Sequence, residues 1–248
     1  MAATVSIVLP TFNREELLCG TLECLLRLDW PDVEIVVVDQ TPSHTAATQA
    51  FLDSITGRIL YLRREKPSVV EAVNHGVRAS HGDIVIFVDD DIRVTDPRFI
   101  AQHLANYEDP AIGVVAGRVL DAQTLKRGVY DPRSADLAWG FFHTGWDHET
   151  PCEFTTAPGA NMSFRREVFM QVGGIDERLV GNAFRWENDF CLKVRKAGYR
   201  VIFDPTPTVH HFYRSAGGNE NRHLHGRDPA SHGWYRDFFQ NQMYVALK

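Results

Sequence analysis

The stretch Ile84-Val85-Ile86-Phe87-Val88-Asp89-Asp90-Asp91 decides how this sequence of 248 residues is interpreted. Five apolar residues, most of them β-branched, run directly into three carboxylates. A continuous apolar run of this kind is typical of a strand that is buried on both faces, as in a parallel sheet. The aspartates then follow the carboxyl end of that strand, which is the edge where open α/β sheets bind ligands.

The three aspartates also predict a metal site. Like charges this close repel one another, which favours a nearby cation, although a solvated acidic turn after a strand stays open at this point. Oxygen ligands on a short loop suit Mg²⁺ or Mn²⁺, and Mg²⁺ commonly binds through carboxylates together with substrate phosphates. We therefore expect Mn²⁺ or Mg²⁺ as the cofactor.

Strand and helix patterns alternate three times before this stretch, which predicts a parallel sheet with helices on both faces. Asp39 ends the second strand, so it is expected at the same sheet edge as Asp89. Asn13 is expected to cap the first helix and Pro67 to begin the third. The strands are expected at 4–9, 33–38, 59–62 and 84–88, and the helices at 15–26, 44–55 and 67–77.

The second half of the chain places further candidates. A helix is expected from residue 185 to 198, with Glu187 and Asp189 in its first turn, where the helix dipole favours acids. A strand at 199–203 precedes the adjacent His210 and His211, which are either a source of one metal ligand or part of a surface loop. The amphipathic segment 234–247 either packs on the domain or touches a membrane surface, and its lack of a strongly basic face favours packing.

Composition narrows the class of protein. Apolar content of 44% and charged content of 23% are ordinary for a soluble globular chain, and the net charge of −6 argues against a nucleic-acid binder. No run approaches the apolar length of a membrane helix, and the four scattered cysteines favour a reducing cytoplasm. GxGxxG and GxxxxGK[ST] loops are absent, which argues against a dinucleotide fold or a P-loop.

Several segments, in order, resemble the family 2 inverting glycosyltransferases. They begin with Ser6-Ile7-Val8-Leu9-Pro10-Thr11-Phe12-Asn13-Arg14, Val36-Val37-Val38-Asp39 and Phe87-Val88-Asp89-Asp90-Asp91. They continue with Gly159-Ala160-Asn161-Met162-Ser163-Phe164-Arg165-Arg166, Glu187-Asn188-Asp189-Phe190 and Ala197-Gly198-Tyr199-Arg200. Each is weak alone, but the ordered set, which covers about residues 4 to 212, is specific. It implies an α/β GT-A (nucleotide-diphospho-sugar transferase) fold: one compact domain with a mostly parallel central sheet flanked by helices and a smaller acceptor-side half.

The resemblance also implies the site. Glu187 matches the catalytic base, Asp91 the direct metal ligand of the DxD motif, and His210 a histidine that completes the metal and diphosphate site. Many members have two adjacent acids where this chain has Trp186-Glu187-Asn188, so Asp189 stays open as the base. The implied nucleotide-sugar-binding residues are Pro10, Thr11, Asn13, Asp39, Asn74, Asp89, Asp90, Gly159 and Asn161.

Two departures from the family pattern concern the nucleotide. Gln40 follows Asp39 where the family often has a second acid, and Ala72-Val73-Asn74 stands where many members have Ala-Arg-Asn. The base of the donor therefore stays open, with a UDP-sugar as the leading expectation.

The implied reaction is metal-dependent, inverting transfer of a hexose from a nucleotide diphosphate-sugar to a glycan or lipid-linked acceptor. Its setting would be bacterial-type polysaccharide or glycoconjugate biosynthesis in the cytoplasm or at the inner face of the membrane, with peripheral contact through the C-terminal helix. One alternative is a nucleotidyltransferase that forms the sugar nucleotide, although its usual Gly-rich basic loop is missing. Another is a catalytically silent nucleotide-sugar-binding module. The expected division is a donor-binding half at 1–120, an acceptor half at 121–212, and a mobile loop with a helix at 213–248.

Overall fold

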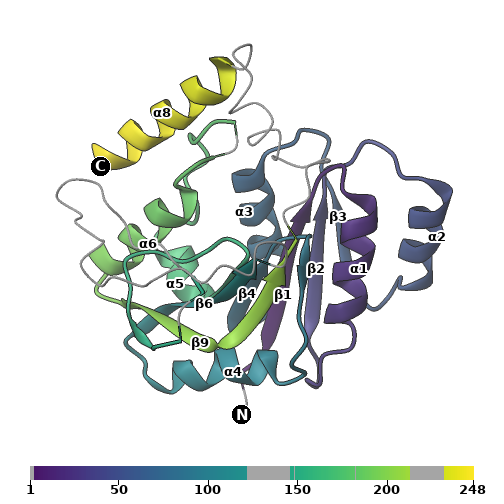
Figure 1. Cartoon of the computed structure of the whole chain (residues 1–248), viewed down its shortest axis with the longest axis horizontal. Coiled ribbons are helices and arrows are strands. Elements are labelled where there is room, and N and C mark those ends of the chain that lie inside the picture. Colours follow the sequence, from purple (N-terminus) through teal and green to yellow (C-terminus); the bar gives the residue numbers. More distant parts are fainter. Residues whose placement is uncertain (1–2, 122–145, 148, 182, 213–231) are drawn as a thin grey trace.

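The computed structural model describes residues 3–121, 146–147, 149–181, 183–212 and 232–248. Within these ranges one central sheet has helices on both faces, in the strand order β3-β2-β1-β4-β8-β6-β9-β5, with β7 paired to β9 (Figure 1). The strands are β1 (Val5–Thr11), β2 (Glu34–Asp39), β3 (Leu60–Arg63), β4 (Ile84–Val88), β5 (Ile92–Arg93), β6 (Ile112–Asp121), β7 (Cys152–Glu153), β8 (Asn161–Arg165) and β9 (Arg200–His211). The helices are α1 (Glu15–Leu25), α2 (Ala46–Ser54), α3 (Val69–Ala79), α4 (Phe99–Ala105), the 3₁₀ turn η1 (Asn106–Glu108), α5 (Arg166–Gln171), α6 (Trp186–Lys196) and α8 (His232–Ala246).

Two apolar layers, one on each face of the sheet, form the core. Successive strand residues point to opposite faces, so Val8 and Val36 join a cluster with α3, α5 and α6. Ile7 and Val37 instead join a second cluster with α1, α2 and α4. Each fully buried aliphatic side chain contributes about 1.5–3 kcal/mol of burial free energy. The two-sided burial explains the continuous apolar runs, and the predicted α/β fold with a helix-flanked central sheet is confirmed.

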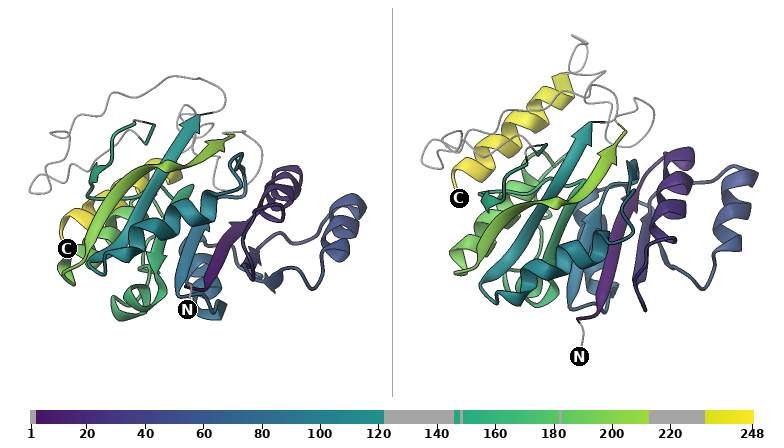
Figure 2. Two further views of the ribbon diagram at one scale, coloured as in Figure 1. Left: turned by 90° about the horizontal axis from the view of Figure 1, so that it is seen from below. Right: turned by 60° about the horizontal axis from the view of Figure 1, so that its bottom comes forward.

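The sheet changes character beyond β4. Strands β3, β2, β1 and β4 pair in parallel, so their carboxyl ends share one edge. Strand β8 then pairs antiparallel with both β4 and β6, while β6 pairs in parallel with β9. The amino end of β8 therefore meets the carboxyl end of β4. Figure 2 shows the resulting arrangement from two sides, with the N-terminal and C-terminal halves side by side along one sheet.

Three predicted boundaries are wrong, each for a local reason. Strand β1 continues through Pro10, because β1 pairs with β4 only as far as Val8 and the missing N–H of proline needs no partner on that side. Asn13 does not cap α1, because its φ of 55° is left-handed and the helix starts one residue later, after Arg14. Pro67 does not begin α3, because the Ser68 side chain caps that helix.

Strand β9 is longer than the pattern at 199–203 predicts. It passes a register shift, at which Gly117 of β6 faces Asp204 and the next residue of β6 faces Thr208, and then resumes pairing as far as His211. The Asp204 carboxylate, which accepts hydrogen bonds from the backbone N–H and hydroxyl of Thr206, holds the bulged residues. Both histidines of the adjacent pair thus belong to a strand and not to a loop after it.

The C-terminal helix α8 packs on the domain through one face. Asn241 and Val245 are buried, and the Phe238 ring stacks on Phe184 at a centroid distance of 4.2 Å. None of the helices in the described ranges is both long enough and apolar enough to cross a bilayer. The predicted mobile loop falls on residues 213–231, outside the described ranges.

Candidate active site

Three potential metal ligands meet at the carboxyl edge of the sheet. Asp89 and Asp91 follow β4, and His211 ends β9. The antiparallel pairing of β5 with β9 sets Ile92 opposite His211, which brings the end of β9 against the aspartate loop. Each of the three residues offers one ligand atom, and these atoms all lie within 4.8 Å of one another.

The electrostatics of this group suit a cation. His211 Nε2 lies 2.8 Å from Asp91 Oδ1 and 3.5 Å from Asp89 Oδ2. Burial alone lowers the pKa of the His211 imidazole, but the Asp91 carboxylate outweighs it and holds that pKa above its usual value. Both carboxylate oxygens of Asp91 are buried and make no hydrogen bond of good geometry within the described residues. Two carboxylates and one imidazole are also a donor set that Mn²⁺ accepts, so the residues present fit the expected cofactor.

His211, rather than its neighbour, belongs to this group. His210 was expected at the metal site, but it lies outside the cluster and faces Arg93 in the strand register. Adjacent residues of a strand point to opposite faces, so only one histidine of the pair can reach the aspartates. The alternation along β9 could have decided between them, had the strand been extended that far.

Asp90 is part of the scaffold beneath the site. Thr11 Oγ1 donates to Asp90 Oδ2 at 2.6 Å, and an Arg14 guanidinium nitrogen donates to Asp90 Oδ1 at 2.8 Å. Thr21 Oγ1 donates to the Asp90 carbonyl at 2.8 Å. Burial raises the pKa of the Asp90 carboxyl to about 7, aided by Asp91 and opposed by Arg14. These bonds tie the loop after β1 to the loop after β4, so the two loops form one wall of the site.

Arg14 is a residue that the sequence patterns did not single out. Its guanidinium lies 3.1 Å from Asp91 Oδ2 as well as touching Asp90, and it is almost fully buried. Because the Arg14 guanidinium lies beside Asp91, it would also lie close to an anionic group bound at the metal site. Its position immediately after Asn13, in the first matching segment, is the signal that could have identified it.

Asp39 ends β2 at the same edge and is fully buried. The Thr41 backbone N–H donates to Asp39 Oδ1 at 2.7 Å, while the Tyr61 hydroxyl and His44 Nε2 both lie 2.6 Å from Asp39 Oδ2. Burial and the neighbouring Asp39 raise the pKa of Tyr61 to about 12. The exposed Asn13 lies nearby, because its backbone N–H donates to Thr41 Oγ1. The predicted nucleotide residues of the first two strands are therefore brought together.

Two other predicted nucleotide residues are used by the fold. The Asn74 amide donates to the Ile175 carbonyl and accepts from the Ile175 N–H, which fastens α3 to the segment after α5. The Asn161 amide donates to the carbonyls of Arg118 and Pro207, and its oxygen lies 2.9 Å from His103 Nε2. Both side chains are fully buried within the protein. The amides of Asn74 and Asn161 therefore stabilise the fold, and they are not included in the proposed nucleotide site.

Glu187 reaches the same edge from α6. A Cβ placed on Gly159 would lie 2.9 Å from Glu187 Oε1, so the carboxylate rests against the backbone just before β8. Because Val88 pairs with Asn161, the chain before Asn161 runs beside the aspartates that follow Val88. The Trp186 ring also meets Phe87 of β4 edge-on at 5.3 Å. These contacts bring the predicted base and the metal group to one edge of the sheet.

Asp189, the other candidate base, is held elsewhere. Lys248 Nζ donates to Asp189 Oδ1 at 2.7 Å, and Lys193 Nζ lies 3.4 Å from Asp189 Oδ2. The side chain is buried against the C-terminal end of the described chain. Two residues apart on a helix means about 200° of rotation, so Glu187 and Asp189 face in different directions. Asp189 is therefore held by two lysines on a different side of the helix from Glu187.

Comparison with known proteins adds independent findings. The sequence model of the family described as Glycosyl transferase family 2 matches residues 6–173. An uncharacterized protein of Sinorhizobium fredii is 29% identical over 88% of this chain, which spans only 25% of that protein. A glucosyl-dolichyl phosphate glucuronosyltransferase of Haloferax volcanii is 26% identical over 84% of this chain and 68% of its own length.

The fold also has counterparts among solved structures. A mannosyltransferase from Pyrobaculum calidifontis, solved in complex with GDP-Man and Mn²⁺, aligns with a TM-score of 0.65. The alignment covers 99% of this chain and 70% of the mannosyltransferase, at 19% sequence identity. At that identity the likeness establishes a shared fold.

Proposed function

This chain belongs to Glycosyl transferase family 2 and has the GT-A fold, and from this premise we propose that it transfers a sugar from a nucleotide diphosphate-sugar to an acceptor hydroxyl with inversion at the anomeric carbon. One observation carries the proposal. The acidic group that suits a cation and the Glu187 carboxylate lie at the same sheet edge, where open α/β sheets bind ligands.

The metal role falls to Asp89, Asp91 and His211, which takes the place expected for His210. The closeness of these residues supports this, because their three ligand atoms all lie within 4.8 Å of one another and could share one cation. A bound Mn²⁺ or Mg²⁺ would stabilise the charge that grows on the departing diphosphate. Arg14 adds a fixed positive charge on the same side of the site.

Glu187 acts as the general base that removes the proton from the acceptor hydroxyl as the new glycosidic bond forms. A positioned base of this kind contributes about 10²–10⁴-fold to the rate. The acceptor attacks from the side opposite the leaving diphosphate, which inverts the anomeric carbon. The ion pairs of Asp189 with Lys248 and Lys193 support Glu187 over Asp189 in this role.

The donor grip is assigned to the loops after β1 and β2. Thr11, Asn13 and Asp39 meet there with Pro10, which lies in the buried end of β1. Gly159 lets the backbone lie against the Glu187 carboxylate, because any side chain at this position would meet it. In this division residues 1–120 hold the donor, and residues 121–212 supply the base and the acceptor side.

The acceptor is a glycan or a lipid-linked sugar, and the setting is polysaccharide or glycoconjugate biosynthesis in the cytoplasm or at the inner face of the membrane. The Haloferax volcanii relative, a glucosyl-dolichyl phosphate glucuronosyltransferase, supports the lipid-linked class. UDP-sugars are the first donors to test, followed by the GDP-mannose that accompanies the mannosyltransferase structure.

The test is a transfer assay with a panel of nucleotide diphosphate-sugars, Mn²⁺ and lipid-linked or glycan acceptors. It follows nucleoside diphosphate release by chromatography and the product anomer by NMR. Glu187→Gln should abolish transfer while donor binding survives, and Glu167→Gln, an exposed first-turn acid of α5, is the matched control. Near-normal turnover in Glu187→Gln would remove that residue from the role. Pyrophosphate release from a nucleoside triphosphate and a sugar phosphate would instead identify a nucleotidyltransferase, and donor binding without turnover a silent module.

A further inference from the structure

The outer face of α8 carries a row of exposed apolar side chains. Tyr235, Phe239, Met243 and Leu247 follow one another at intervals of four residues, so they line one side of the helix and its last turn. Their exposed fractions rise along the row, from 42% for Tyr235 through 58% and 62% to 83% for Leu247. An ordered row of large exposed apolar groups marks an interaction surface.

The opposite face holds α8 in a fixed position. Asn241 exchanges two hydrogen bonds with the backbone of Val180, and Gln242 Oε1 accepts from Arg185 Nε at 2.7 Å. Arg185 is the residue immediately before α6, the helix that carries Glu187. The helix is therefore attached to the segment that positions the proposed base. The inward face of α8 contacts Val180 and Arg185, and the apolar row lies on the other face, which is exposed.

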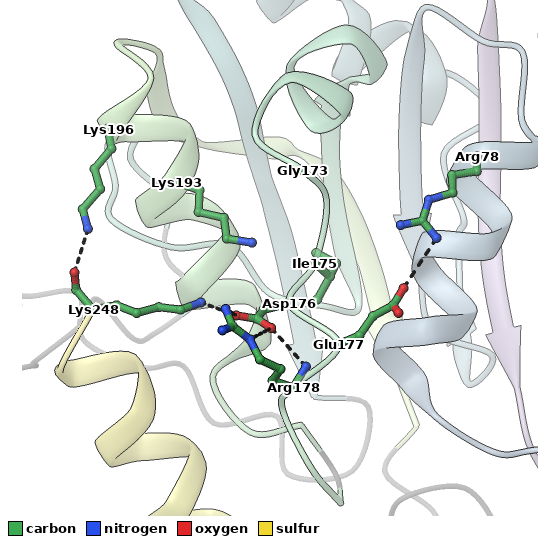
Figure 3. A pocket seen from close by; sticks show the side chains of 9 residues that line it. All are labelled: Arg78, Gly173, Ile175, Asp176, Glu177, Arg178, Lys193, Lys196 and Lys248. Atoms are coloured by element: carbon green, nitrogen blue, oxygen red, sulfur yellow. Dashed lines mark hydrogen bonds and ion pairs between the residues drawn. The ribbon is translucent and has the colours of Figure 1, made fainter.

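A basic pocket of about 450 Å³ lies beside the C-terminal end of α8, where Lys248 lines it (Figure 3). Lys248, which lines it, directly follows Leu247, the last and most exposed member of the row. Two carboxylates, Asp176 and Glu177, face the cations of this pocket. The five cationic residues are Arg78, Arg178, Lys193, Lys196 and Lys248.

The basic pocket is positively charged, whereas the whole chain is negatively charged. The whole sequence has a net charge of −6, yet the five cations of this pocket outnumber its two acids together with Asp189, the nearby carboxylate that pairs with Lys193 and Lys248. The side chains of Arg178 and Arg78 are 75% and 56% exposed, although each pairs with one of the two acids. A positive surface beside an exposed apolar helix face has the chemistry of an anionic lipid interface, where apolar groups insert and Lys and Arg meet lipid phosphates.

We propose that α8 and the basic pocket together dock this protein on the surface of a bilayer that contains anionic lipids, with the row from Tyr235 to Leu247 lying in the interface. The link from α8 through Gln242 to Arg185 then sets the Glu187 side of the site near the lipid surface. Resting on the proposed glycosyl transfer, this selects a lipid-linked acceptor over a free glycan.

The primary test is vesicle flotation with the purified chain of residues 1–248, using phosphatidylcholine vesicles with and without phosphatidylglycerol and no donor or acceptor. The chain should float with the anionic vesicles and much less with neutral ones, and added salt should weaken the binding. Phe239→Glu should lower the bound fraction by at least about 10-fold, because it places a charge in the interface. Lys196→Glu should weaken binding to anionic vesicles only.

Two matched variants keep the test specific. Met170→Glu changes an apolar side chain that is 48% exposed on α5, and Arg27→Glu changes a cation that is 76% exposed after α1. Neither belongs to the docking surface, so neither should change flotation. Thermal melting of every variant confirms that the fold is intact.

Three results would overturn the docking proposal. The first is wild-type chain that ignores anionic vesicles, and the second is Met170→Glu weakening flotation as much as Phe239→Glu. The third is a dimer that Phe239→Glu dissociates in light scattering while no vesicles are bound, which would make the row a contact between two copies. Flotation needs no turnover, so vesicle binding without transfer would reject the proposed function and support docking. Transfer to a lipid-linked acceptor without vesicle binding would support the proposed function and reject docking.

Discussion

Gly159→Ala should impair catalysis while leaving the fold intact. The added Cβ would lie 2.9 Å from Glu187 Oε1 and 3.2 Å from Trp186 Cζ2. Gly159 is not among the glycines with positive φ, so alanine fits its backbone conformation. The indole is buried in the core and yields little, whereas the Glu187 carboxylate is the far end of a flexible side chain that can move away. The substitution therefore acts on the proposed base.

The size of the effect follows from these distances. An ordinary carbon–oxygen contact begins at about 3.4 Å, so the carboxylate must retreat by about 0.5 Å. A misplacement of about 1 Å costs about 100-fold in rate, so we expect kcat to fall by about 10-fold or more. The donor KM should change little, because the nucleotide is held by other loops.

The assay is steady-state transfer with a saturating acceptor, combined with thermal melting. Gly233→Ala is the control, because nothing lies within 4 Å of a Cβ at that exposed position of α8. Wild-type kcat in Gly159→Ala, with an unchanged melting temperature, would show that the reaction does not depend on Glu187 in its present position. A loss of kcat accompanied by a large drop in melting temperature would mean that the substitution acts through the fold instead.

Three further outcomes are expected. His211→Ala should weaken Mn²⁺ binding by at least about 10-fold in calorimetric titration, whereas His210→Ala should not, and equal losses would refute the assignment. Gly117→Ala should lower the free energy of unfolding by about 2–4 kcal/mol in urea titration, because its methyl group would overlap the Asn161 amide, and a neutral result would contradict that packing. Hydrogen bonds from Arg178 and others hold the pKa of Asp176 well below its usual value, so its stabilisation is present at neutral pH and is lost as the pH falls. Asp176→Asn should therefore cost about 2 kcal/mol at pH 7, and the difference from wild type should shrink below about pH 4; a difference independent of pH would refute the electrostatic cause.

The elements of the first half could be predicted because each strand there is buried on two faces. Short apolar runs such as Ile84–Val88, bounded by polar turns, are typical of buried strands, and the turns separate them cleanly. The ends of the strands were less predictable, because they depend on where the neighbouring strand stops pairing. Pro10 stays in β1 only because β4 stops pairing beside Val8, and no pattern within residues 4–13 reveals where a neighbouring strand stops.

The sequence brings candidate residues to one sheet edge where residue chemistry and strand ends coincide, as at Asp39 and Asp91. It does not show which way a side chain points where tertiary pairing decides the direction. A buried Asn74 or Asn161 looks the same in sequence whether its amide bonds to a ligand or to a backbone carbonyl. The choice between His210 and His211 depended on extending β9 past two prolines that usually end a strand.

The register shift in β9 has a consequence for related chains. Residues 205–207 leave the ladder between Asp204 and Thr208, so they form a bulge upstream of His211 that has no pairing partner on β6. Relatives could gain or lose a residue in this bulge and keep the pairing of the strand after it, because the bulged residues do not pair with β6. The same alteration after Thr208 would exchange which histidine faces the aspartates. Length variation is therefore expected to be tolerated on one side of Thr208 and forbidden on the other.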